Sequence, residues 1–547
     1  MFRKARSPTL TPVGDGIASG NMNTTQPQLS ASRPASSSTS VSRACAALVI
    51  LGLAARVALA AEPAPPTPRL GKLSLGWASV DITPPQPVAL CGQFDRRLSK
   101  RVNDPLSATA LAIEARDANG VLDQVVMVSA DVVCIRRGDL ERVRALVKPR
   151  APDLDPAKII LSTTHTHTAP VLVDARETNL EPYDLMATFV YRVPEQGVMQ
   201  PRDYVERFVG RVAEAVVEAW KSRQPGGVSW ALSYAVVGHN RRAHYASGRS
   251  QMYGPTDQPE FDGFESTTDP GIELLFTWDA ERKLTGVAVN LACTSQAVEN
   301  ADYVSADFWH DARTELRRRH GDGLFILPLC GAAGDQSPHL LFRKQAEATL
   351  RQRKGNLTPR QEIGQRLAAA VNAGLDLAKT DIRAEVPFVH RTQMLPLPVR
   401  KVTRQEYAAA KKGQQELEAR GLEALDSPDY IWWRIRRNIA ARYEVQDQQS
   451  LCEAEIHTLR LGDIAFATNP FELYLDYGLR LKARSPAEQT FVVQLACDTL
   501  GYLPTERGVS GGHYSAEIMS NIVGPEGGRR LVERTVEALK SLWPPAP

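Results

Sequence analysis

Two histidines stand two positions apart in the segment L-S-T-T-H-T-H-T-A-P, in a chain that has ten histidines in all. An apolar run at 158–161 leads directly into them. If this run is a strand that continues to residue 166, its two-residue period places His165 and His167 on the same face. Two neighbouring imidazoles can bind a metal ion or act as an acid–base pair. The alternative is that these polar residues only end a strand at the surface.

A second candidate segment, C-G-A-A-G-D-Q-S-P-H, follows an apolar run at 324–329. A strand that leads into a glycine-rich loop and a helix is where α/β proteins place reactive groups. Ser337 could be a nucleophile or could position one, with Asp335 and His339 nearby. Ser337 before Pro338 is also the pattern of a helix N-cap, so a purely structural role competes with the catalytic one.

Four further polar side chains are ambiguous in the same way. Glu472 could ligate a metal, although Asn469 and Glu472 are also spaced as a capping box. Arg241 follows a predicted strand and could bind an anion or a carbonyl oxygen, or lie in a surface turn. Tyr502 and Tyr514 lie in glycine-containing segments, where they would ordinarily be packing aromatics on turns.

Strand-like apolar runs alternate with amphipathic stretches along the chain, which predicts an α/β (mixed α+β) fold with mixed β-sheets flanked by helices. The stretch 340–445 is highly charged and is predicted to be a mostly helical insertion. No linker rich in proline, glycine or serine follows residue 71. One large catalytic domain is therefore expected over 72–547.

The first 61 residues have a different composition. They begin with a Ser-, Thr- and Pro-rich leader that is expected to be disordered. Arg43 then precedes an apolar stretch that ends in V-A-L-A, the pattern of a secretory signal peptide cleaved near Ala60-Ala61. Arg56 interrupts the short apolar stretch, which argues against a membrane-spanning helix. A proline-rich linker is expected over 62–71, and the mature protein is expected to be secreted or periplasmic.

Overall composition is that of an ordinary globular protein, with 43% hydrophobic and 23% charged residues and a formal net charge of +3. So small a charge on 547 residues gives no reason to expect nucleic-acid binding. The chain has seven cysteines, and removal of the signal peptide takes away Cys45. The rest are too few for a disulfide framework, and most lie in apolar runs typical of buried free thiols.

Taken together, these segments resemble the neutral/alkaline non-lysosomal ceramidases. The segments T-H-T-H-T, N-R-R, S-A-D, G-D-x-S-P, P-x-E and G-Y-L-P-T occur in the order and rough spacing of that family, and the stretch at 76–84 is similar to its opening. The resemblance covers nearly all of the chain from about residue 72 to 543. It implies a secreted zinc-dependent amidohydrolase that acts on a small-molecule or lipid substrate and could touch a membrane surface peripherally. It predicts no oligomeric state.

Position by position, the resemblance implies a metal site and a set of catalytic residues. His165, Glu472 and Tyr502 match ligands of Zn²⁺. The remaining matches are His167 to a catalytic or substrate-facing histidine, Ser337 to the assigned nucleophile, Tyr514 to a tyrosine near the scissile amide, and Arg241 to an arginine of the same site.

One zinc ligand of the family has no matching histidine here. Counting back from S-A-D at 305–307 leads to Cys293 where the family has its second zinc histidine. A thiolate is also a good zinc ligand, so His165, Cys293, Glu472 and Tyr502 are the predicted set. Loss of the ion, or binding by three ligands, are the alternatives. The C-terminal immunoglobulin-like domain usual in the family is not expected either.

Three functions follow from these observations. The first is a zinc-dependent hydrolase of N-acyl amides, acting on a ceramide-like lipid or another acylated amine. The second is an enzyme on the same scaffold with a non-lipid substrate, such as a glycoconjugate or a cell-wall amide. The third is a non-catalytic secreted binding protein that has lost its metal.

Overall fold

The computed structural model describes residues 69–174, 176 and 181–543. The predicted leader, the signal peptide and most of the proline-rich linker lie outside the described residues. The first strand, β1 (Leu70–Asp81), begins at the end of that linker. Within the described part of the chain, no helix has the length and apolar character needed to cross a membrane.

A twelve-stranded mixed sheet branches at β1, because β1 pairs antiparallel with three strands along its length. One branch contains β4 (Ser107–Asp117), β5 (Gly120–Ala130) and β6 (Ile159–Thr163). The second contains β7 (Gln224–Tyr234), β12 (Gly271–Asp279), β13 (Leu284–Leu291) and β14 (Phe325–Cys330). The third contains β16 (Glu385–Pro398), β17 (Leu451–Leu461), β18 (Ile464–Thr468) and β20 (Gln489–Val493).

Each branch ends in a parallel pair, namely β5 with β6, β13 with β14 and β18 with β20. Most other neighbours in the sheet are antiparallel. Loops at the carboxyl ends of parallel strands are where open α/β sheets place ligand sites. The segments that follow β6, β13, β14, β18 and β20 carry most of the predicted site residues.

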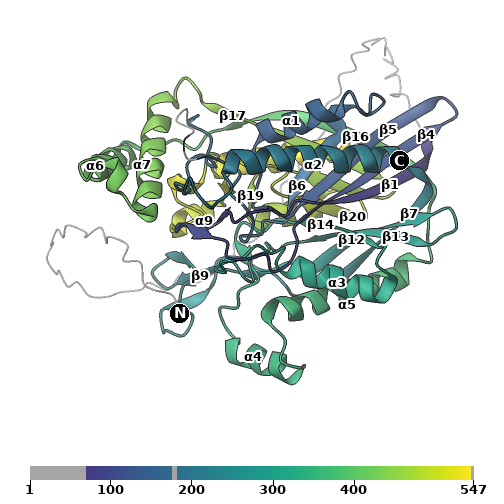
Figure 1. Cartoon of the computed structure of the whole chain (residues 1–547), viewed down its shortest axis with the longest axis horizontal. Coiled ribbons are helices and arrows are strands. Elements are labelled where there is room, and N and C mark those ends of the chain that lie inside the picture. The colour runs from purple at the N-terminus through teal and green to yellow at the C-terminus, as the bar shows by residue number, and fades with distance from the viewer. Residues whose placement is uncertain (1–68, 175, 177–180, 544–547) are drawn as a thin grey trace, which may run out of the picture. The chain divides into compact units, whose positions relative to one another are not determined.

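Helices cover the sheet branches (Figure 1). α1 (Arg137–Val147) packs on α2 (Pro201–Lys221), and α2 lies against β1 and β4. Its residues Tyr204, Phe208 and Val212 recur at every fourth position and are all buried, which makes the helix amphipathic. The other covering helices are α3 (Phe308–His320) with α5 (Pro359–Ala378) on the second branch, and α8 (Leu475–Arg484) with α10 (Pro525–Lys540) on the third.

The remaining elements are short strands, one short helix and three 3₁₀ turns. They are β2 (Ala89–Leu90), β3 (Arg97–Leu98), β8 (His239–Asn240), β9 (Arg242–Tyr245), β10 (Ser250–Met252), β11 (Phe261–Phe264), β15 (Gln336–Ser337), β19 (Glu472–Leu473), β21 (Tyr502–Leu503), α9 (Glu506–Gly511) and the 3₁₀ turns η1 (Pro156–Lys158), η2 (Leu422–Ala424) and η3 (Ile518–Ser520).

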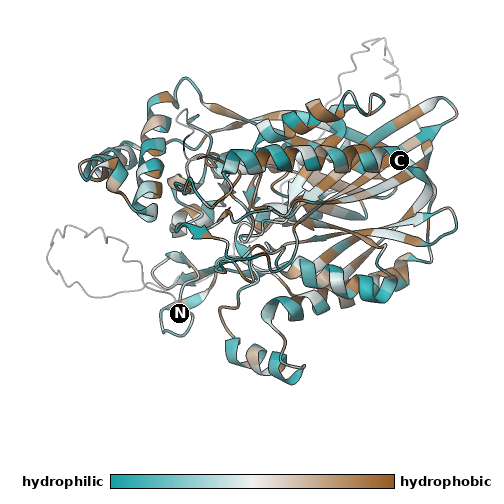
Figure 2. Cartoon of the chain, viewed as in Figure 1, coloured by the Kyte–Doolittle hydropathy of each residue, from teal (hydrophilic) through white to brown (hydrophobic). Residues whose placement is uncertain are grey.

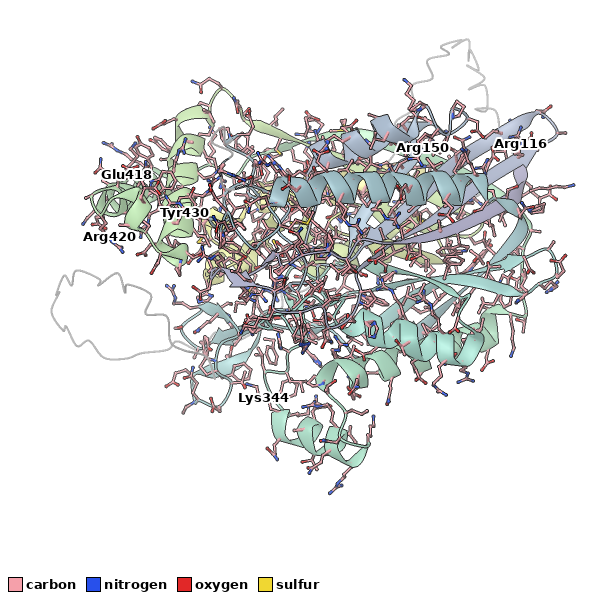
Figure 3. All side chains as sticks on the ribbon, viewed as in Figure 1. Arg116, Arg150, Lys344, Glu418, Arg420 and Tyr430 are labelled. Atoms are coloured by element: carbon pink, nitrogen blue, oxygen red, sulfur yellow. The ribbon has the colours of Figure 1, made fainter. Side chains whose placement is uncertain are left out.

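The charged stretch 340–445 contains α4 (Lys344–Arg353), α6 (Arg404–Glu418) and α7 (Ser427–Val445). Hydrophilic residues predominate in these helices, whereas the strands of the sheet carry many hydrophobic residues (Figure 2). α6 and α7 pack on each other. Trp433 in α7 donates a hydrogen bond over 3.0 Å to Glu418, the last residue of α6, which is labelled in Figure 3.

The same stretch also contains β16, a strand of 14 residues in the sheet, which the sequence analysis did not predict. Its burial alternates as a strand requires, but Pro387, Pro396 and Pro398 obscured the pattern, since proline usually argues against an interior strand. The predicted fold class, a mixed α/β domain with flanking helices, is confirmed.

We expect Gly76→Ala to destabilise the layer between β1 and α2. A Cβ at Gly76 would lie 2.0 Å from the carbonyl oxygen of Ala219, so backbone must move, which costs about 1–3 kcal/mol. Gly210→Ala, in α2 with nothing within 4 Å of its new Cβ, is the matched control and should stabilise by up to about 1 kcal/mol. Urea unfolding measures both, and equal stabilities would contradict the packing described.

Candidate active site

His165 and His167 lie side by side, but a turn rather than a strand brings them together. β6 ends at Thr163, so the predicted continuation to residue 166 is wrong. His165 has a positive φ of 62°. The two Nε2 atoms are nevertheless 3.3 Å apart. The left-handed residue redirects the chain so that both rings face one place.

Glu472 comes to the same place from the far end of the chain. Its Oε2 lies 3.4 Å from His165 Nε2. Glu472 belongs to β19 and pairs in parallel with Tyr502 of β21. The capping-box interpretation of Glu472 is wrong, because α8 begins at Leu475 with Tyr474 as its N-cap. Among the described residues, Glu472 Oε2 is buried and has no hydrogen-bond partner.

The proton positions at His165 favour a cation beside Glu472. His165 Nδ1 lies 2.8 Å from the carbonyl oxygen of Val133, which can only accept, so Nδ1 carries a proton. A neutral ring then presents a lone pair on Nε2 to the carboxylate of Glu472. Two electron-rich atoms in contact need a proton or a metal ion between them.

This donor set fits a zinc ion. Imidazole nitrogen and carboxylate oxygen are ordinary zinc ligands, and a hydrogen bond from the other ring nitrogen is the usual way to orient a ligating histidine. Burial raises the pKa of Glu472, but positive charge on a protonated His165 ring, together with Arg241 and the Tyr502 hydroxyl, lowers it more, so it stays below the usual value. The carboxylate is therefore ionised at neutral pH and available to a cation.

Arg241 is fully buried and ties the site together. Its Nη2 donates to the carbonyl of Gly334 over 2.9 Å and to the hydroxyl of Tyr502 over 3.2 Å. Its Nη1 donates to Tyr253 over 3.1 Å and to Gln296 over 3.2 Å. Burial lowers the pKa of Arg241, yet its tyrosine neighbours and Glu472 raise it well above the usual value. Arg241 is thus a fixed positive charge.

Ser337 lies in β15, and no helix begins at Pro338, so the N-cap interpretation is wrong. Its Oγ accepts hydrogen bonds from the Tyr253 hydroxyl and from the His339 amide, each 3.1 Å long. Within the described part of the chain, no imidazole or carboxylate is hydrogen-bonded to this Oγ. Asp335 instead accepts a hydrogen bond from Asn240 over 2.9 Å, which joins the loop before β15 to β8.

Tyr514 packs on the site from the loop after α9. Its ring lies edge-on to Tyr502, with 5.6 Å between the centroids, and 5.4 Å from Phe94. Burial, mainly, raises the pKa of the Tyr514 hydroxyl well above its usual value. This hydroxyl therefore stays protonated at neutral pH and can donate.

The structure does not bring Cys293 to the histidines. Its thiol is buried in an apolar cluster with residues such as Val237 and Phe308, and donates to the carbonyl of Thr294 over 3.4 Å. Burial raises its pKa well above the usual value.

Gln296, three residues further on, reaches the histidines in its place. Its Oε1 accepts from Arg241 and from Thr294, which directs the amide nitrogen to His167 Nε2, 2.8 Å away. The resemblance thus indicated the segment that reaches the histidines, but named Cys293 rather than Gln296. Glutamine is not a common metal ligand, so its presence in the sequence predicts no site. The only signal for this segment was that the family has a zinc histidine there.

Glu299 was also missed. Its carboxylate lies between two histidines, 3.5 Å from His167 Nδ1 and 3.0 Å from His339 Nε2. His339 lines a neighbouring cavity of about 200 Å³ with charged walls that include Lys344, labelled in Figure 3, and Arg366. The buried histidine pair is thereby connected to a polar opening.

A second group of potential metal ligands lies elsewhere in the described residues. The ligand atoms of Glu455, His457 and Cys497 lie within 4.8 Å of one another, and all three residues are buried. No pattern in the sequence singled out this group, because Glu455 and His457 lie in what the sequence shows only as a strand.

The comparisons with known proteins agree with the predicted fold. No protein-family model and no curated protein matches the chain. The chain is similar to the solved structure of neutral ceramidase from Pseudomonas aeruginosa, with a TM-score of 0.60 and 17% identity, over 87% of this chain and 76% of that chain. A ceramidase structure described as complexed with C2 matches over the same shares, at a TM-score of 0.60 and 16% identity. Likeness at such identity shows a ceramidase-like fold.

We expect Gly92→Ala to displace His167. Gly92 has a φ of +96°, and its Cβ would lie 2.4 Å from Cγ of the His167 ring. Gly321→Ala is the matched control, since Gly321 has a φ of +98° and nothing within 4 Å of the new Cβ. Both variants carry the strain of a left-handed alanine, but only Gly92→Ala adds a clash, which we expect to cost a further ~1–3 kcal/mol of unfolding free energy.

Imidazole NMR signals provide the second measurement for this pair. The His167 resonance should shift in Gly92→Ala and stay unchanged in Gly321→Ala. Identical spectra and identical unfolding free energies for the two variants would contradict the close approach of Gly92 to the ring.

Proposed function

We propose that this protein is a metal-dependent hydrolase of N-acyl amides, with a ceramide-like lipid or another acylated amine as substrate. The observation that carries the proposal is the convergence, on a ceramidase-like fold, of polar side chains from separate segments of the chain. These are His165, Arg241, Ser337, Glu472, Tyr502 and Tyr514.

His165, Glu472 and Tyr502 would hold the ion, and Zn²⁺ fits their nitrogen and oxygen donors best. A bound zinc ion supplies Lewis acidity that polarises a carbonyl and lowers the pKa of water. Cys293 is left out of the proposed set because its thiol lies in an apolar cluster. The unpartnered oxygen of Glu472 supports the assignment.

Arg241 and Tyr514 would stabilise negative charge on the carbonyl oxygen of the substrate. The guanidinium of Arg241 is already fixed by Gly334 and Gln296, so it needs no reorganisation when charge develops. The Tyr514 hydroxyl keeps its proton at neutral pH and can donate it as a hydrogen bond.

His167 would move the proton to the leaving amine. Gln296 donates to its Nε2, so that nitrogen has a lone pair, and Nδ1 faces the carboxylate of Glu299. A neutral imidazole in this position can accept a proton and pass it on. Ser337 either attacks the carbonyl or orients water. With both contacts to its Oγ coming from donors, its own proton is left free for the substrate.

Two features bear on the substrate class. Phe94 stacks on Trp432 and meets Phe189 and Tyr514 edge-on, which makes an aromatic surface suited to an acyl chain. The charged cavity at His339 instead favours a polar substrate, such as a glycoconjugate or a cell-wall amide. A series of N-acyl amines that varies chain length at one end and charge at the other separates the two. The predicted signal peptide would place either activity in the periplasm or outside the cell.

His165→Ala should lose both hydrolysis and about one equivalent of bound zinc, because the ring is a proposed ligand. His310→Ala, at a half-buried position of α3, is the control and should keep both. Elemental analysis and a hydrolysis assay with N-acyl amines are the measurements. A His165→Ala protein with full activity and full metal content would contradict the proposal.

Arg241→Lys should lower kcat by about a hundredfold or more, because lysine keeps the charge but loses the planar fork that reaches several acceptors at once. Arg249→Lys, at an exposed position, should have no effect. Steady-state kinetics on the best substrate measures both variants. An Arg241→Lys enzyme with unchanged kcat would show that the guanidinium takes no part in the reaction.

A further inference from the structure

The buried group Glu455, His457 and Cys497 lies apart from the histidine centre. Glu455 and His457 are two positions apart on β17, so strand geometry places them on one face. Cys497 follows β20 with a φ of +67°, and its amide donates to the carbonyl of Leu161 in β6. The group therefore joins the third branch of the sheet to the first.

Two of the three ligand atoms face the third, which is His457 Nε2. Glu455 Oε1 lies 2.9 Å from this nitrogen and Cys497 Sγ lies 3.4 Å from it. This is not a relay of the catalytic-triad type, because the thiol and the carboxylate face the same ring nitrogen rather than opposite ones.

The proton order in the neighbouring hydrogen bonds makes that nitrogen a lone pair. His390 Nδ1 faces the carbonyl of Gln124 at 2.9 Å and must donate, so His390 Nε2 is an acceptor. It lies 2.8 Å from His457 Nδ1, which therefore carries the proton. The Thr392 hydroxyl donates its proton to the carbonyl of Ala157, so in its contact with His457 Nδ1 it is the acceptor. A neutral His457 then directs a lone pair at a carboxylate and a thiol.

Arg144 completes the surroundings of the group. Its Nη2 lies 2.5 Å from Glu455 Oε1, and its Nη1 lies 3.1 Å from Oε2. A ligating carboxylate or histidine is usually oriented by such outer hydrogen bonds. Here the Glu455 carboxylate is held by Arg144 and the His457 ring by His390.

We propose that Glu455, His457 and Cys497 bind a divalent cation, with Zn²⁺ the best match, at a site of three protein ligands that is distinct from the histidine centre. Nitrogen, thiolate and carboxylate together are the donors zinc prefers. Ligand bonds of about 2.0–2.3 Å at tetrahedral angles separate ligand atoms by about 3.3–3.6 Å, so Sγ is already placed and the carboxylate must move by roughly half an ångström. The ion would fix the segment that leads from β20 to Tyr502.

Cobalt substitution tests the site directly, because only a thiolate ligand gives Co²⁺ an intense charge-transfer band. The protein is produced in medium with Co²⁺ in place of Zn²⁺, so that a buried site fills during folding. We expect the band in the wild-type protein, and about two equivalents of metal per chain by elemental analysis. Absence of the band in the wild-type protein would overturn the proposal, and would instead support an imidazolium at His457 paired with Glu455.

Cysteine variants assign the band. Cys497→Ser should lose it along with about one equivalent of metal, whereas Cys293→Ser should keep both. His457→Gln retains the thiol and should also lose the ion, which covers the case in which Cys497→Ser does not fold. A band that disappears in Cys293→Ser and persists in Cys497→Ser would overturn the proposal and place the thiol ligand at the histidine centre.

The outcome is independent of the proposed enzymatic activity. His165→Ala should keep the charge-transfer band even though it loses hydrolysis. A protein that shows the band but no hydrolysis of any N-acyl amine would refute the proposed function and leave the proposed site at Cys497 supported.

Discussion

The contact between His165 and Glu472 is the constraint on which the rest of the site depends. A buried carboxylate with an unpartnered oxygen faces a ring nitrogen whose partner nitrogen is already committed to a carbonyl. Such a contact is unfavourable unless positive charge lies between or beside the two groups. Arg241 supplies one fixed charge nearby, and a divalent cation would supply another.

The fold explains how residues so far apart in sequence meet at this contact. β1 divides the sheet into three branches, and each branch ends in a parallel pair whose loops carry site residues. Short strand pairs then fix individual side chains, as β19 and β21 do for Glu472 and Tyr502, and β8 and β15 do for Ser337. The branched sheet thus anchors the ends of the loops that carry the histidines, while the short strand pairs fix Glu472, Tyr502 and Ser337.

Much of the fold could be predicted from sequence, because apolar periodicity is a local property. The apolar runs at 284–291 and 464–468 each predict a strand, and β13 and β18 occur over the same residues. β16 was missed because prolines usually argue against an interior strand, but β16 pairs with β1 over 385–387 and with β17 over 388–398, so each proline has a strand partner on one side only. The convergence of His165 and His167 was anticipated for the wrong reason, since it depends on a left-handed residue that no periodicity reveals.

The site was less predictable, because the contacts of Gln296 and Glu299 depend on three-dimensional packing. Conversely, Cys293 has a ligand's chemistry but points into an apolar cluster. An anomalous-diffraction map from crystals, recorded on both sides of the zinc absorption edge, tests the central claim most directly. The account predicts a zinc peak in contact with His165 Nε2, Glu472 and the Tyr502 hydroxyl. A well-ordered His165 bonded directly to Glu472, with no anomalous peak beside it, would contradict the account.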